Sequence, residues 1–154
     1  MLRILASGWQ ATGIIRMRSG PYLSIVSGFD QALSGTANQR AVQGLADPYL
    51  PNKGIDHYLN PAAFKQPELG TYSPLGANNI LGPGLVQIDM GLTRNFQVRE
   101  RQTVQFRAEG FNVANHVNLD PTSTGFNAIN NANFGRFLAA YDPRILQFAL
   151  KYVF

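Results

Sequence analysis

The sequence has 154 residues and a formal net charge of +4, with 45% hydrophobic but only 14% charged residues. A soluble domain normally carries about 25% charged residues, so this chain has few side chains with which to cover a fully solvated surface. It contains no cysteine, which excludes disulfides and thiolate metal sites, and no apolar run approaching ~18 residues, which excludes a transmembrane helix. Its basic residues are scattered rather than clustered, so nucleic acid is not expected as a partner.

Four segments alternate apolar and polar residues with the period of two that is typical of β-strands. The first, residues 9–18, alternates only weakly. The second, residues 85–98, is the clearest, because its even-numbered residues are apolar except Arg94 and its odd-numbered residues from Gln87 onward are polar or glycine. We expect the Arg94 side chain to reach the membrane interface from near one end of this strand.

The other two strands are predicted at residues 103–112 and 144–154. The charged turn at 99–102 is short enough to make the second and third strands an antiparallel hairpin. Each of the four runs is about as long as the ~9–11 residues that a tilted strand needs to cross the hydrocarbon layer.

The connections between these strands are long, short and long. They cover about residues 19–84, 99–102 and 115–143, and the two long ones are rich in Gly, Pro, Asn and Ser. This alternation of long and short connections is typical of membrane barrels, which have extended outer loops and tight periplasmic turns. The sequence therefore predicts an all-β fold, the C-terminal portion of a transmembrane β-barrel with about four antiparallel strands and long, structureless outer loops.

The C-terminal segment Arg144–Phe154 resembles the terminal assembly signal of outer-membrane proteins, an alternating strand that ends on an exposed aromatic residue. The resemblance implies that the barrel assembly machinery reads one apolar stripe of this strand. That stripe consists of Leu146, Phe148, Leu150, Tyr152 and Phe154.

Longer stretches resemble the Oar-like family of TonB-dependent transporters, large receptors with a carboxypeptidase-regulatory-like N-terminal domain. In chain order they are Gly8–Gln10 through Ser19–Tyr22, Tyr58–Phe64, Asn79–Gly84 leading to Asp89, Phe106–Asn118, Asn133–Arg136 and the terminal strand. Gly110 stands where the family often has an aromatic residue, and Val113-Ala114 replaces a bulkier pair, which predicts weaker packing of one strand.

Such receptors have barrels of about 22 strands with a plugged lumen. The resemblance therefore implies a wall and assembly-signal segment of a transporter that imports a ligand across the outer membrane of a Gram-negative-type bacterium. Expected partners are outer-membrane lipid and the assembly machinery, with TonB reached only through an N-terminal part. Residues 1–8 contain no apolar segment long enough for a signal peptide, and no plug domain is found, so we expect a fragment or a truncated reading frame.

Two other interpretations of the sequence remain. One is a terminal segment of a different outer-membrane barrel, such as a porin-like channel, which additional hairpins upstream would favour over a plug domain. The other is a soluble all-β binding module, which would stay in the aqueous phase without detergent.

No catalytic or cofactor site is predicted. The two histidines, His57 and His116, have no metal-ligand spacing around them, and no G-x-S-x-G elbow is present, so neither an enzyme nor a metal or cofactor site is expected. The candidates for lumen-facing residues are Asp89, Arg107 and Glu109. Residues 82–84 predict a turn, and the Asn-rich run at 127–133 favours turns over a ligand contact.

Overall fold

The computed structural model describes residues 7–122 and 124–154, so residues 1–6 of the segment considered for a signal peptide lie outside the described part. The chain divides into two compact units. The sheet unit contains the described residues up to Arg18 together with Leu85–Asn118 and Asp142–Phe154, and the loop unit contains Ser19–Gly84 and Leu119–Tyr141. Within the described residues, no helix has the length and apolar character needed to span a membrane.

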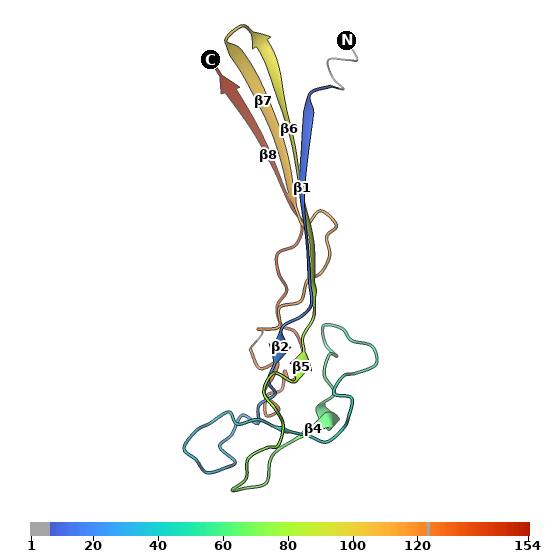
Figure 1. Cartoon of the computed structure of the whole chain (residues 1–154), viewed down its shortest axis with the longest axis vertical. Coiled ribbons are helices and arrows are strands. Elements are labelled where there is room, and N and C mark those ends of the chain that lie inside the picture. Colours follow the sequence, from blue (N-terminus) through green and yellow to red (C-terminus); the bar gives the residue numbers. More distant parts are fainter. Residues whose placement is uncertain (1–6, 123) are drawn as a thin grey trace. The chain divides into compact units, whose positions relative to one another are not determined.

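The sheet unit is built on one four-stranded antiparallel sheet in the order β1-β6-β7-β8 (Figure 1). Its strands are β1 (Trp9–Arg18), β6 (Leu85–Arg99), β7 (Gln102–Phe111) and β8 (Ile145–Val153). The predicted all-β class with four antiparallel strands is therefore confirmed. The last strand ends one residue before the C-terminus, so Phe154 follows β8 rather than belonging to it.

The register of the sheet brings most of the apolar residues of the four strands onto the same side. Residues opposite each other in a ladder share a face, and Trp9 lies opposite Arg94, as Leu92 does opposite Ala108 and Phe106 opposite Leu150. We call this side the apolar face. It comprises Trp9, Ala11, Gly13, Ile15, Met17, Val86, Ile88, Met90, Leu92, Arg94, Phe96, Val104, Phe106, Ala108, Gly110, Leu146, Phe148, Leu150 and Tyr152.

The opposite side, the polar face, carries mostly amides, hydroxyls and charges. It comprises Gln10, Thr12, Ile14, Arg16, Arg18, Leu85, Gln87, Asp89, Gly91, Thr93, Asn95, Gln97, Thr103, Gln105, Arg107, Glu109, Phe111, Ile145, Gln147, Ala149, Lys151 and Val153. A sheet with one apolar and one polar face is what alternation with a period of two produces when the ladders are in register.

Arg94 is the one charged residue of the apolar face, and aromatic rings cover it. Its guanidinium carbon lies 4.4 Å from the ring centre of Phe96 and 5.3 Å from that of Trp9, and the residue is only 6% exposed. The Trp9 ring also meets Phe106 edge-on at 6.0 Å. Cation–π contacts therefore hold the Arg94 side chain against these two rings, and its position at the membrane interface stays a prediction.

Gly110 leaves room on the apolar face of β7 for a neighbouring side chain. A Cβ at this position would come within 2.6 Å of Val113 Cγ1 and 3.2 Å of Leu146 Cδ2. The Val113 side chain lies in the space beside Gly110, and the weaker packing expected of this strand stays a prediction.

The loop unit is folded rather than structureless, which corrects the prediction for the two long connections. It contains the short antiparallel pairs β2 (Tyr22–Leu23) with β5 (Ile80–Leu81) and β3 (Val42–Gln43) with β4 (Phe64–Lys65). A 3-10 turn, Pro61–Ala63, begins after Asn60, whose side chain accepts a hydrogen bond from the Ala62 N–H.

The core of the loop unit is largely aromatic and draws on both long connections. Phe126 stacks on Phe137 at 4.5 Å, and Tyr58 meets Phe137 edge-on at 5.0 Å. The buried apolar residues are Ile25, Ala41, Tyr58, Leu59, Ala63, Phe64, Ile80, Phe126, Phe134 and Phe137. Aromatic rings of this kind bury large areas, so scattered Tyr and Phe residues can form a core without any periodic pattern.

Two of the stretches that resemble the Oar-like family contact each other in this unit. Gly135, in the left-handed region at φ 73°, accepts hydrogen bonds from the backbone N–H groups of Tyr58 and Leu59. A Cβ at Gly135 would lie 2.9 Å from the Leu59 Cβ, so both the conformation and the close approach require glycine.

Candidate functional site

The polar face of the four-stranded sheet is the candidate functional site, because it gathers all three residues predicted to face a lumen. Arg107 lies opposite Thr93 and Glu109 opposite Gly91, while Asp89 is two residues before Gly91 on the same strand. The parity of these positions places Asp89, Arg107 and Glu109 on one side of β6 and β7.

Asp89 is the most highly connected of the three. Its Oδ2 accepts a hydrogen bond from Arg16 Nη2 at 3.1 Å, and its Oδ1 accepts from Gln87 Nε2 and from the Asn112 backbone N–H, both at 2.9 Å. The Asp89 side chain is 15% exposed, whereas that of Arg16 is 57% exposed. This carboxylate therefore ties β1, β6 and the end of β7 together on the polar face.

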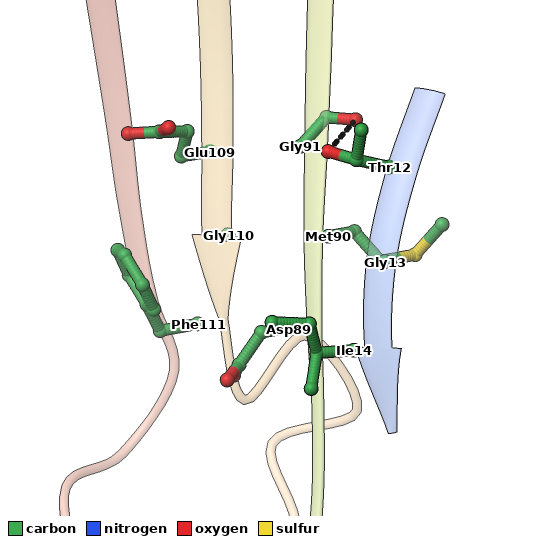
Figure 2. A pocket seen from close by; sticks show the side chains of 9 residues that line it. All are labelled: Thr12, Gly13, Ile14, Asp89, Met90, Gly91, Glu109, Gly110 and Phe111. Carbon is green, nitrogen blue, oxygen red and sulfur yellow. Dashed lines mark hydrogen bonds between the residues drawn. The ribbon is translucent and has the colours of Figure 1, made fainter. Parts of the chain in front are cut away.

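A shallow hollow of about 180 Å³ lies beside Asp89 (Figure 2). It exists because Gly91 has no side chain, and a Cβ there would approach Thr12 Oγ1 to 2.8 Å. The hollow is lined by Thr12, Gly13, Ile14, Asp89, Met90, Gly91, Glu109, Gly110 and Phe111. Thr12, Asp89 and Glu109 thus contribute one polar side chain from each of three strands to a lining that otherwise consists of glycine and apolar residues.

Arg107 and Glu109 form only a loose pair. Arg107 Nη1 lies 3.7 Å from Glu109 Oε1, and their side chains are 51% and 36% exposed. Exposed ion pairs of this kind contribute about 0–1 kcal/mol, so both groups remain accessible to other partners.

A cluster of asparagines at the end of β7 was not predicted from the sequence as a site. Asn112, at φ 48° and 2% exposed, donates through Nδ2 to the carbonyls of His116 at 2.9 Å and Asp142 at 3.3 Å, and its Oδ1 accepts from the His116 N–H at 3.0 Å. Asn115 Oδ1 accepts from the Arg144 N–H at 3.1 Å. We call Asn112, Asn115 and Asn118 the asparagine latch.

Asn118 completes this latch at the start of β6. Its Oδ1 accepts from the Val86 N–H and its Nδ2 donates to the Val86 carbonyl, both at 2.9 Å. The signal available in the sequence was the spacing of three asparagines within the stretch Phe106–Asn118. Asparagine tolerates the left-handed conformation and bonds nearby backbone, which suits it to a point where a strand ends.

The residues of the predicted assembly signal occupy the apolar face of β8 and the position after it. Leu146, Phe148, Leu150 and Tyr152 are between 51% and 73% exposed, and Phe154 is 91% exposed. The Phe154 ring lies 6.0 Å from that of Tyr152. Within the described part of the chain, β8 forms one edge of the sheet and β1 the other.

The remaining polar groups make local contacts. His116 Nδ1 lies 3.1 Å from Asn118 Oδ1, and no group of three or more His, Asp or Glu side chains among residues 7–122 and 124–154 could hold a metal ion. In the Asn-rich run, Asn131 Oδ1 accepts from the Asn133 N–H, as the turn interpretation predicts, whereas Asn127 Nδ2 donates to the Ser24 carbonyl of the other long connection.

Asp30 organises an exposed turn of the loop unit. It accepts hydrogen bonds from the N–H groups of Ser34 and Gly35 and from Gln39 Nε2. These bonds, chiefly the one from the Ser34 N–H, lower the pKa of the Asp30 carboxyl below its ordinary value.

Comparison with known proteins gives one match that covers almost the whole chain. The family model of the outer membrane beta barrel domain matches residues 1–147. No curated protein and no solved structure matches the chain. The match agrees with the two-faced sheet and indicates a location in the outer membrane. The chain therefore belongs to the outer membrane beta barrel domain family.

Proposed function

We propose that this chain forms part of the barrel wall of a TonB-dependent outer-membrane transporter of the Oar-like type, which imports a ligand across the outer membrane. The observation that carries the barrel-wall part of the proposal is the two-faced sheet, whose four apolar stripes lie on one side and whose charges lie on the other, apart from Arg94. In a barrel wall, the apolar face contacts lipid and the polar face lines the lumen.

The Oar-like type is supported by what the resembling stretches do in the fold. Tyr58–Phe64 and Asn133–Arg136 meet in the core of the loop unit, and Phe106–Asn118 contains the latch. That these stretches make specific structural contacts is the support for the Oar-like part of the proposal.

The terminal strand supports a role in assembly. β8 presents an apolar stripe on one face and a strand edge that no other described strand occupies. An unpaired edge can add to another sheet by backbone hydrogen bonding, which is how assembly machinery would engage it. In the proposed orientation, the β6–β7 turn and the C-terminus face the periplasm, and residues 19–84 and 115–143 face outward.

The competing function is that of an open, porin-like channel, because its wall would have the same two faces. Conductance of the full-length protein in planar lipid bilayers separates the two. A TonB-dependent transporter has a plug in its lumen, so we expect no steady conductance until mild denaturant loosens that plug. A stable open channel in the absence of denaturant would contradict the transporter proposal and support the porin-like one.

A further inference from the structure

Two cations on the polar face flank a gap between β7 and β8. Arg107 lies opposite Ala149, and Lys151 lies opposite Gln105, so the two cations occupy diagonal positions across the ladder. Because Ala149 is small, a hollow of about 230 Å³ remains, and it is lined by Gln105, Arg107, Ala149 and Lys151. This hollow is separate from the one beside Asp89.

Neither cation is strongly neutralised by the protein. Arg107 has the loose contact with Glu109 at 3.7 Å, and Lys151 makes no ion pair among the residues that the structure describes. The side-chain amide of the neighbouring Gln105 already has a partner of its own, since its Nε2 donates a hydrogen bond to Asn95 Oδ1 at 2.9 Å. Diagonal neighbours in an antiparallel ladder are within reach of long side chains, and like charges at such close range are unfavourable unless something offsets them.

We propose that this hollow binds an oxyanion, the carboxylate or phosphate group of a solute inside the barrel. The inference rests on the proposed function, because it requires the polar face to line the lumen. A guanidinium can bind a carboxylate or phosphate through two parallel hydrogen bonds, and the Lys151 ammonium adds a second positive charge. The volume of the hollow suits one such group, and the half-exposed Arg107 is reachable from solvent.

The test uses single cysteines in the full-length protein, since this chain has no cysteine of its own. Ala149→Cys lies between the two cations, and Gln147→Cys, opposite Glu109 on the same face of β8, is the matched control. Each variant is first checked for folding by its mobility on unheated gels. Each is then reacted with an anionic methanethiosulfonate (sulfonatoethyl) and with a cationic one (trimethylammonioethyl).

We expect the ratio of anionic to cationic labelling rates to be roughly 3- to 10-fold higher at position 149 than at position 147, at low ionic strength. Replacing both cations with glutamine, Arg107→Gln with Lys151→Gln, should lower the ratio at position 149 several-fold, and this fall separates the effect of the cations from that of Glu109 opposite position 147. Inorganic phosphate or acetate should slow the anionic labelling at 149 more than chloride does at matched ionic strength, and the more effective of the two identifies the preferred group.

Three results would overturn the inference. Equal rate ratios at 149 and 147 would show that the hollow does not attract anions. A raised ratio without protection by either phosphate or acetate would show a positive potential but no binding site. Failure of both cysteines to react with either reagent would show that the polar face does not meet water, which would overturn the proposed lumen lining as well.

Discussion

Replacing Asn112 with alanine should destabilise the sheet unit, because this side chain satisfies backbone groups where β7 ends. The change removes two donated bonds, to the carbonyls of His116 and Asp142, and one accepted from the His116 N–H. Each such bond contributes about 0.5–1.5 kcal/mol, and a left-handed alanine costs about 1–2 kcal/mol more. Since Asn112 is only 2% exposed, water cannot easily replace the lost partners, and we expect a total loss of about 2.5–6.5 kcal/mol.

Urea unfolding of the full-length protein in detergent micelles measures this loss as a lower midpoint. Asn112→Gly serves as the decisive companion, because glycine adopts the positive φ freely but makes no side-chain hydrogen bond. Asn95→Ala is a matched control, since Asn95 is exposed and accepts one bond from Gln105, so its midpoint should change by little. An Asn112→Gly midpoint equal to that of the unchanged protein would refute the role given to the side chain.

Two further predictions concern the faces and the terminus of the sheet. Phe148→Arg, on the apolar face, should reduce folding into liposomes by about 2–4 kcal/mol near the bilayer midplane, whereas Gln147→Arg on the polar face should be tolerated; equal yields would contradict the lipid-facing assignment. Phe154→Ser should lower the folded fraction of the full-length protein in cells, seen as heat-modifiable mobility on gels, more than Val153→Ser does. Unchanged folding of both terminal variants would argue against an assembly signal.

The strands could be predicted because a period of two is a local property of the sequence. Side chains of an extended strand alternate between faces, so the pattern from Val86 to Phe96 determines both the strand and its apolar side before any partner is known. The same parity correctly grouped Asp89, Arg107 and Glu109 on one face. The ladder that places Arg107 beside Ala149 could not be read from one strand, because it depends on pairing between strands.

The loop unit was missed because its core has no sequence period. Tyr58 and Phe64 come from the first long connection, whereas Phe126 and Phe137 come from the second, and two strands of the sheet separate these connections in sequence. Contacts of this kind are visible only once the chain is folded. The high glycine and proline content of the two connections correctly predicted that their described residues form no long strands. It did not predict that they pack around a common buried core.

The asparagine latch matters because the sheet is proposed to lie in a membrane, where backbone groups cannot bond to water. Within a hydrocarbon layer, every backbone N–H and C=O needs a partner in the protein, and the strand ladders supply one until they end. Gly110 pairs with Met90 on β6 and with Leu146 on β8. β7 ends one residue later, at Phe111, and the chain leaves the sheet at Asn112.

At that point the asparagine side chains act as substitutes for a neighbouring strand. Asn118 satisfies both backbone groups of Val86, Asn115 accepts from the Arg144 N–H just before β8, and Asn112 satisfies His116 and Asp142. Because the Asn112 N–H also donates to Asp89, the same turn fixes a charged side chain on the polar face. A loss of the latch should therefore disturb the rim of the barrel wall and its lining together, while a change at the loosely held Arg107–Glu109 pair should alter the lining alone.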